Sequence, residues 1–292
     1  MPPSPTEAAA VSPTGASAQA SLVEDTVRVT VPARRRVRPR DIWGSLPVGW
    51  MLGRRDAKVK YKQSALGPLW LVLQPLGMLI AVSVAFSTAT NVPTGGVPYV
   101  VFALVGLAVW TFVQMTITVS PQVLQSNWQV VKRSPCPRIA FVTGTLVSVL
   151  PPLGVVLVAA VGAAAISGHI GIEALAMPVL IVWLVVLMWG IGLLIIAIGG
   201  RFRDAVALAP VVVQAGLFLT PYPYPLSHVP DTLAKVLAFN PASGVIEAWR
   251  WSLLGMAPDG FAIVVGLAET VLFGLLGWYV FGRMEPRFSD YV

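Results

Sequence analysis

A regular row of basic residues near position 60 is the part of this sequence best suited to meet an anion. Arg54, Lys58 and Lys62 recur at every fourth position, so on a helix they would lie on one face. A basic face of this kind beside a bilayer lies among lipid phosphates. Gly67 and Pro68 follow, and the chain then becomes uncharged and apolar. We therefore predict a phosphate-facing helix that ends here, and a membrane helix that starts with Pro68 in its first turn.

The sequence lacks the motifs that carry ATP binding or hydrolytic chemistry. It contains no Gly-x-x-x-x-Gly-Lys-Ser/Thr loop, no His-Glu-x-x-His and no Gly-x-Ser-x-Gly. One cysteine, Cys136, and two histidines leave no plausible zinc cluster. We therefore expect a protein that is not an enzyme, with no catalytic residue and no metal or cofactor of its own.

The composition places the chain in a membrane. Of its 292 residues, 56% are hydrophobic and 11% are charged, with a mean hydropathy of +0.76, whereas soluble domains carry about 25% charged residues. Its partners should therefore include membrane lipids and no nucleic acid. Glu269 is an ionisable residue inside an apolar stretch, so it is either a functional group that faces the interior or a hydrogen-bonded packing residue.

Six apolar stretches each come near the roughly 20 residues that cross a bilayer. They run from Leu66 to Ser87, Pro98 to Val119, Ile139 to Ile166, Ala174 to Gly199, Ala205 to Pro221 and Gly260 to Phe281. The fifth stretch is short. With these spans, 18 of the 20 Lys and Arg residues fall on one side, which the positive-inside rule makes cytoplasmic. We therefore predict an all-α, polytopic protein of the inner (cytoplasmic) membrane with six transmembrane helices and both termini in the cytoplasm.

Two segments precede the first span. Residues 1–40 are rich in Pro, Ala, Ser and Thr, lack the apolar core of a secretory signal and end in an arginine cluster, so we expect a disordered basic tail. Residues 41–65 are expected to begin with an amphipathic helix in the membrane interface, divided at Pro47. Its apolar residues are Trp43, Leu46 and Trp50. The two tryptophans are either interfacial anchors or contacts for a partner.

The connection between the second and third spans has the pattern of a short amphipathic cytoplasmic helix over residues 121–134. Ser120 and Pro121 suit the N-cap and the first turn. Pro135 ends the helix because proline cannot donate to the helical ladder. The apolar stripe consists of Leu124, Trp128 and Val131. Such a helix either binds a partner or lies in the interface.

Residues 222–257, between the fifth and sixth spans, contain too many prolines for a spanning helix, yet they include apolar runs. Broken backbone at membrane depth is tolerated only inside protein or along a wet cavity. We therefore predict two short re-entrant helices on the external side; the alternative is an external loop with surface helices. Asn240 should cap the second helix, and Glu247 and Arg250 should neutralise each other.

Aromatic residues gather around these two short helices and in the second span. They are Trp110, Phe112, Tyr222, Tyr224, Trp249 and Trp251. Such rings either stack on sugars along a channel or belong to the aromatic belts of the membrane interface.

The start of the membrane region resembles a known family. The basic helix with Tyr61, followed by Ser64, Leu66–Gly67 and Trp70 before an apolar helix, is similar to the start of the ABC-2 type permease of polysaccharide, O-antigen and teichoic acid exporters. The resemblance covers nearly all of residues 42–292. It implies a pore of two copies, driven by two separate ATP-binding subunits that hold ATP and magnesium, and a glycan on a polyprenyl diphosphate lipid as substrate. The residues implied in recognition of this carrier are Arg54, Lys58, Tyr61, Lys62, Ser64, Leu66 and Gly67.

Two further segments resemble that family. The run Asn127–Arg133 followed by Pro137–Arg138 is similar to the coupling helix that docks on the ATPase, although Cys136 stands where a large apolar or aromatic residue is expected. The residues implied in coupling are Leu124, Trp128, Val131, Lys132, Arg133 and Arg138. The pair Asn240–Pro241 with an arginine about ten residues later resembles the family's external gate helices. The residues implied in the channel and gate are Trp110, Phe112, Tyr222, Tyr224, Asn240, Glu247 and Arg250.

Two other functions stay open at this point. An ABC-2 type exporter of drugs or lipids would share the architecture, but it would not require residues 61–70 in this form. A membrane-embedded glycosyl or acyl transferase would need an internal acid or base, for which Asp204, Glu247 and Glu269 are the candidates.

Overall fold

The computed structural model describes residues 39–62, 65–89, 92–133, 136–202 and 204–285. Nearly all of the predicted tail over residues 1–40 and the last seven residues lie outside these ranges. Within them every regular element is a helix, which confirms the predicted all-α class.

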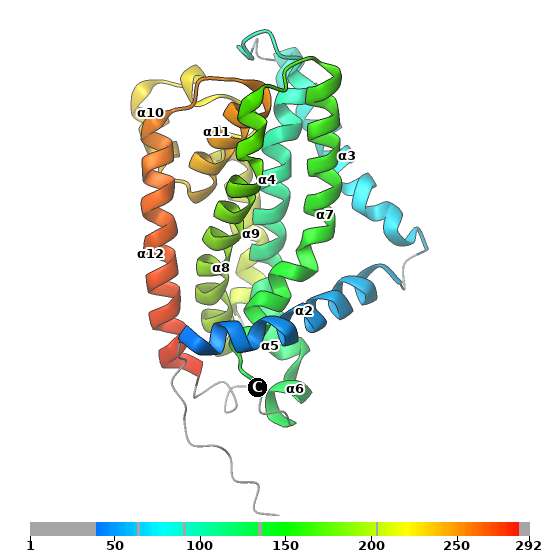
Figure 1. The fold of residues 1–292 in the computed structure, drawn as a ribbon, viewed down its shortest axis with the longest axis vertical. Coiled ribbons are helices and arrows are strands. Elements are labelled where there is room, and N and C mark those ends of the chain that lie inside the picture. The colour runs from blue at the N-terminus through cyan, green and yellow to red at the C-terminus, as the bar shows by residue number, and fades with distance from the viewer. Residues whose placement is uncertain (1–38, 63–64, 90–91, 134–135, 203, 286–292) are drawn as a thin grey trace, which may run out of the picture. The chain divides into compact units, whose positions relative to one another are not determined.

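Five of the described helices are long and apolar enough to cross a membrane (Figure 1). They are α3 (Trp70–Ala89), α4 (Tyr99–Val119), α7 (Ile139–Ile166), α8 (Met177–Arg201) and α12 (Gly260–Met284). The predicted fifth span is α9 (Asp204–Leu219), whose 16 residues rise only about 24 Å at 1.5 Å per residue. A hydrocarbon core is about 30 Å thick, so the sixth crossing stays a prediction.

The other helices lie at the two ends of this bundle (Figure 1). The long helix α2 (Pro39–Lys62) runs across one end, where η2 (Ser120–Gln122), α5 (Val123–Ser126) and α6 (Trp128–Arg133) also lie. At the opposite end lie α10 (Asp231–Ala238) and α11 (Pro241–Leu254). Two short helices over residues 222–257 were predicted and are present; their depth in a membrane stays a prediction. The remaining short turns are η1 (Gly67–Leu69), η3 (Ile172–Ala176) and η4 (Leu226–His228).

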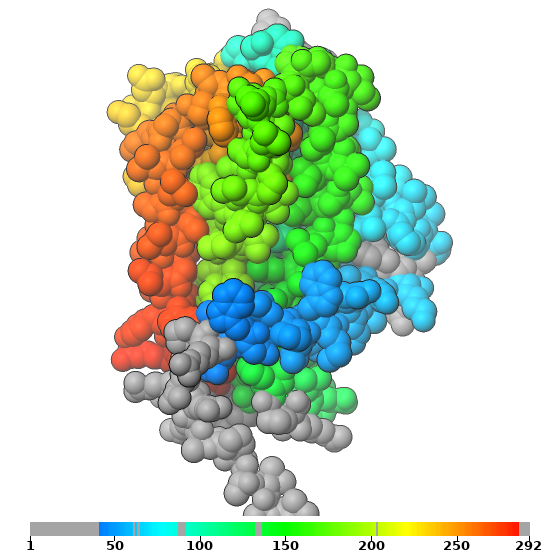
Figure 2. Space-filling model, in the orientation of Figure 1, coloured from blue at the N-terminus to red at the C-terminus, as the bar shows by residue number. Residues whose placement is uncertain are grey.

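The prediction that Pro47 divides the interface helix is wrong, because α2 is continuous through it. Pro47 is exposed, and the opposite face of α2 packs on α7 through Gly49 and Gly53. A Cβ added at Gly53 would lie 2.5 Å from the carbonyl oxygen of Gly144. Close packing along this face therefore outweighs the helix-breaking tendency of one proline. Figure 2 shows α2, in blue, lying across the lower end of the long helices.

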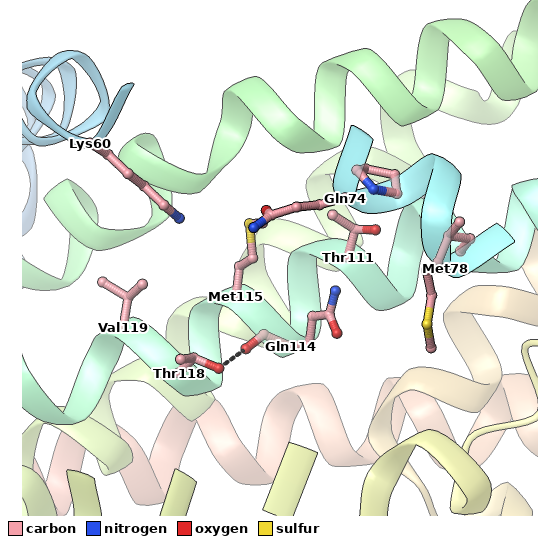
Figure 3. Close-up of a pocket in the computed structure, with 10 residues that line it drawn as sticks. Lys60, Gln74, Met78, Thr111, Gln114, Met115, Thr118 and Val119 are labelled. Carbon is pink, nitrogen blue, oxygen red and sulfur yellow. Dashed lines mark hydrogen bonds between the residues drawn. The ribbon is translucent and has the colours of Figure 1, made fainter. Parts of the chain in front are cut away.

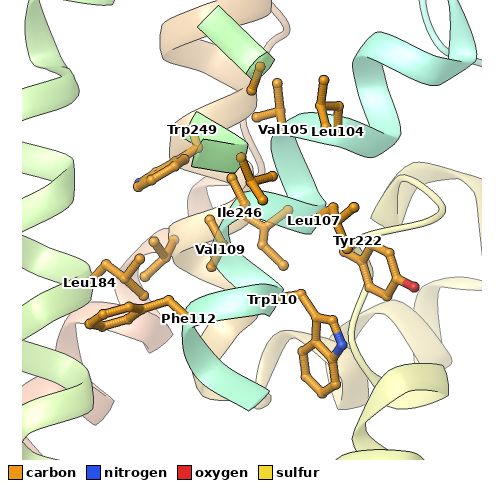
Figure 4. Packing of buried hydrophobic residues seen from close by; sticks show 14 of the residues in the cluster. Leu104, Val105, Leu107, Val109, Trp110, Phe112, Leu184, Tyr222, Ile246 and Trp249 are labelled. Carbon is orange, nitrogen blue, oxygen red and sulfur yellow. The ribbon is translucent and has the colours of Figure 1, made fainter. Parts of the chain in front are cut away.

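Helix α4 lies at the centre of the main apolar core. Phe102, Val105 and Phe112 are fully buried and meet residues of α8 and α11, such as Leu184 and Trp249 (Figure 4). By contrast, little of α3 and α12 is buried, and their apolar side chains face outward. This pattern is expected of lipid-facing helices around a central one.

A second apolar cluster holds the ends of the described chain together. Leu52 of α2 packs with Phe141 of α7 and Phe281 of α12, next to Ile42 and Met284. The start of α2 and the end of α12 therefore lie at the same end of the bundle.

Candidate functional site

A buried arginine braces the loop that follows α9. Arg250 of α11 donates from Nη2 to the carbonyl oxygen of Tyr222 at 2.6 Å and from Nη1 to that of Tyr224 at 3.4 Å. It also pairs with Glu247 at 3.3 Å, and the exposed fractions of the two side chains are 2% and 10%. The predicted Glu247–Arg250 pair is thus confirmed, and it also fixes a neighbouring loop.

Further contacts satisfy this buried charge pair and the loop. The Arg250 guanidinium lies 3.8 Å from the centre of the Phe102 ring, and Glu247 accepts from the backbone N–H of Asp259 at 3.4 Å. The Tyr99 hydroxyl of α4 donates to the carbonyl oxygen of Pro223 at 2.9 Å. A buried ion pair persists only when hydrogen bonds of this kind accompany it.

Asn240 performs two tasks between α9 and α11. Its Oδ1 accepts from the backbone N–H of Ala242 at 3.0 Å, which confirms the predicted cap. Its Nδ2 donates to the hydroxyl of Thr220 at 2.9 Å and to the carbonyl oxygen of Leu219 at 3.1 Å. The cap of α11 therefore also holds the end of α9.

The predicted channel aromatics are mostly core residues in this conformation. Trp110 and Tyr222 stack with ring centres 6.0 Å apart and planes 4° apart, and both are buried (Figure 4). Phe112 is also fully buried, whereas Tyr224 is half-buried. Gly106 makes room for the loop, since an added Cβ would lie 2.9 Å from the Tyr222 carbonyl oxygen. These rings shape the loop, and a sugar could reach Trp110 or Tyr222 only after the loop moved.

The prediction of one coupling helix over residues 121–134 needs correction. The chain continues from α4 through η2 and α5, and it breaks at Asn127 before α6. Ser120 does not act as a cap, and its hydroxyl has no hydrogen-bond partner among the described residues. The cause of the break is visible at Asn127, whose φ of −111° and ψ of 24° are not helical. Its Nδ2 donates to the carbonyl oxygen of Val123 at 3.0 Å, and its Oδ1 accepts from Arg55 of α2.

The predicted apolar stripe of this coupling segment splits between the core and the surface. Leu124 and Val131 are buried in the second cluster, whereas Trp128 is 44% exposed. Arg138 donates to the carbonyl oxygen of Val131 at 3.3 Å and so supports α6 from within the chain. The side chains of Lys132 and Arg133 lie outside the described residues. Trp128 is therefore the exposed residue of this stripe.

The basic stripe of α2 is exposed, as its periodicity predicts. Arg54, Lys58 and Lys62 all lie on the surface, while the Tyr61 side chain and Ser64 are outside the described residues. Exposed Leu66 precedes η1. Gly67 has a φ of +48°, which lies in the left-handed region that favours glycine.

Two cavities meet near the C-terminal end of α2, and the stripe residues line neither of them. The larger, of about 730 Å³, lies between α2, the coupling segment and α7 and is lined by residues that include Arg55, Asn127 and Trp128. The smaller, of about 290 Å³, lies between the end of α2, α3 and α4 (Figure 3). Lys60 lines both; the residue is exposed, and partial desolvation lowers the pKa of its ammonium group. The four-residue period of the stripe passes over Lys60, so periodicity alone did not identify this residue.

The remaining candidate, Glu269, lies on α12 and is half-buried. Its Oε2 has no hydrogen-bond partner among the described residues. Next to it, Thr270 accepts from the indole N–H of Trp183 at 2.8 Å and so joins α12 to α8.

Comparisons with known proteins agree with this arrangement. Residues 48–254 match the sequence profile described as ABC-2 type transporter. The chain is also 22% and 21% identical, each over 247 residues, to two proteins from Klebsiella pneumoniae named O-antigen export system permease protein RfbA. Each alignment covers 82% of this chain and 93% of the relative. The matched segment contains the basic end of α2, the coupling segment and the braced loop. The chain therefore belongs to the ABC-2 type transporter family.

Proposed function

We propose that this chain is the membrane-spanning permease subunit of an ATP-driven exporter that moves a lipid-linked polysaccharide, such as an O-antigen or a teichoic acid polymer, across the cytoplasmic membrane. The single observation that carries the proposal is the similarity to O-antigen export permeases over 93% of their length. The substrate carrier would be a polyprenyl diphosphate lipid.

Exposed tryptophans at one end of the bundle support the proposed contact with ATP-binding subunits. Trp128 is exposed on the coupling segment, and Trp43 and Trp50 are exposed on α2 at the same end of the bundle. Two ATP-binding subunits, which would hold ATP and magnesium, would contact these surfaces on two copies of this chain. Hydrolysis would then move the coupling segment and α2, with both termini of the chain on this cytoplasmic side.

The same end of the bundle supplies the first contact for substrate. The exposed cations Arg54, Lys58 and Lys62 would attract the diphosphate, because ammonium and guanidinium groups form strong charge-assisted hydrogen bonds with phosphate oxygens. At the far end, the loop that Arg250 braces would act as the external gate for the glycan.

The test is uptake into inverted membrane vesicles that contain this chain and its ATP-binding partner. Labelled lipid-linked glycan should enter in an ATP-dependent manner, and Trp128→Ala combined with Lys132→Ala should lower uptake and coupled ATP turnover while expression holds. ATP-driven movement of a drug or a plain lipid without glycan uptake would instead support the other type of ABC-2 exporter. A change in the chemistry of the glycan without transport would support a transferase.

A further inference from the structure

Polar and apolar residues line the smaller cavity in equal number, although it lies in an otherwise apolar part of the bundle. Gln74 of α3 and Gln114 and Thr111 of α4 line it within the first and second spans, with Lys60 of α2 at one side (Figure 3). In the close-up, Lys60 and Gln74 point into the same space from different helices. Polar side chains at membrane depth are costly, so a cluster of them from three helices calls for a polar occupant.

Thr111 provides independent support for an occupant. Other helical threonines, such as Thr116 and Thr118 of the same helix, donate to the carbonyl oxygen four residues earlier, at 2.8 and 2.7 Å. Thr111 lines the cavity and is only 1% exposed, yet its hydroxyl has no hydrogen-bond partner among the described residues. A buried hydroxyl left without a hydrogen-bond partner is destabilising, because it has lost its bonds to water. A ligand in the cavity would remove that cost.

The lining selects an anion with several oxygens. An ammonium group, two amides and two hydroxyls can donate hydrogen bonds, and the described lining residues include no Asp or Glu. The volume of about 290 Å³ is roughly ten times the 30 Å³ of one liquid water molecule. It therefore suits a phosphate or diphosphate group and is too small for a polymer.

The neighbouring surface suits a lipid chain. Leu73, Leu76 and Ile80 are exposed apolar residues of α3, the helix that supplies Gln74. An acyl or prenyl chain attached to the phosphate could lie along this surface, because lipid chains cover exposed apolar side chains in a bilayer.

We propose that this cavity seats the phosphate group of a membrane lipid, with Lys60 as the counter-charge and Gln74, Gln114 and Thr111 as hydrogen-bond donors. The shared chemistry is a lipid-borne phosphate, whether it belongs to a polyprenyl diphosphate carrier or to a resident anionic phospholipid. Identification of the lipid with the exported carrier rests on the proposed function; the site itself does not.

The test measures binding of two probes to the purified full chain in phosphatidylcholine nanodiscs. One probe is a short-chain polyprenyl diphosphate, and the other is phosphatidic acid. Lys60→Gln should weaken binding about tenfold or more, since hydrogen bonds to charged groups contribute about 1.5–3 kcal/mol, and Thr111→Val about threefold or more. Lys60→Arg should restore most of the affinity because it restores the charge.

Two matched controls separate the cavity from general effects. Arg283→Gln removes one positive charge from an exposed residue at the same end of the bundle, and Thr116→Val removes a buried hydroxyl of α4 that does not line the cavity. Both should change affinity less than twofold. Equal losses for Lys60→Gln and Arg283→Gln, or binding of neither probe by the native chain, would overturn the proposal. If Thr111→Val unfolds, Gln74→Leu takes its place.

The two probes distinguish the sources of the phosphate. Preference for the diphosphate identifies the carrier, and equal binding of both probes identifies a resident phospholipid; either result supports a lipid phosphate site. Because the measurement needs neither ATP nor the partner subunit, its failure is distinguishable from failure of the export proposal.

Discussion

The guanidinium of Arg250 is joined to the carbonyl oxygen of Tyr222 by a 2.6 Å hydrogen bond that spans 28 positions of the chain. The bond ties the middle of α11 to a proline-rich loop whose residues 220–225 form no helix or strand. The loop is fixed from several sides, by Arg250, by Tyr99 and by Asn240. The loop can move away from α11 only when these bonds are broken together.

Replacement of Arg250 should be strongly destabilising. Arg250→Gln leaves Glu247 as an unpaired buried charge, which typically costs about 3–5 kcal/mol, so the thermal midpoint in detergent should fall by roughly 6 °C or more. The double variant Glu247→Gln/Arg250→Gln removes both charges and should recover part of this loss. A double variant that is no more stable than Arg250→Gln would contradict the buried pair.

The close approach at Gly106 gives a second prediction. Gly106→Ala places a methyl group 2.9 Å from Tyr222, and such overpacking costs about 1–3 kcal/mol. The matched control is Gly162→Ala on α7, where an added Cβ meets nothing within 4 Å. That change should be neutral or stabilise by about 0.5–1 kcal/mol. Thermal unfolding of the two variants measures the difference, and equal effects would show that the loop does not rest on Gly106.

The contact between Arg55 and Asn127 gives a third prediction. It connects α2 to the break in the coupling segment, and Arg55 also pairs with Asp56 at 2.8 Å. In a double-mutant cycle of Arg55→Ala and Asn127→Ala, the unfolding free energies should couple by about 0.5–1 kcal/mol, a modest value because Arg55 is partly exposed. Additive losses would show that the two residues do not act together.

The fourth prediction concerns pH. Burial raises the pKa of Glu285 to about 7, while Arg138 opposes and Asp41 adds to the rise. The unfolded chain ionises near the ordinary value of 4.5, so between about pH 4.5 and 7 the folded chain holds the extra proton, and its stability falls as pH increases. Glu285→Gln should therefore raise the thermal midpoint at pH 8 and should flatten the loss between pH 5 and pH 8. An unchanged pH profile would show that folding does not raise the pKa of Glu285.

Features set by neighbouring residues were predictable from the sequence. The cap at Asn240 and the pair Glu247–Arg250 depend only on spacing within one helix, and both are present. The long apolar helices follow from composition and length. In each case the rule acts over a few residues, so no knowledge of distant contacts was required.

Features set by distant residues were not predictable. Pro47 predicts a break in the helix, but α2 is continuous through it and packs closely on α7. At the break, Asn127 accepts a hydrogen bond from Arg55, 72 positions away in the chain. The cavity that includes Lys60 exists because three helices converge there, and periodicity along one helix cannot show which cation faces that space.

The glycine face of α2 has a mechanical consequence. Gly49 and Gly53 bring the backbone of α2 so near to Thr143 and Gly144 that even an added Cβ would collide with them. We expect α2 and α7 to move as one rigid body, so that a force applied to α2 tilts α7. Little of α3 is buried against the rest of the bundle. We therefore expect α3 to be the helix that such a tilt displaces.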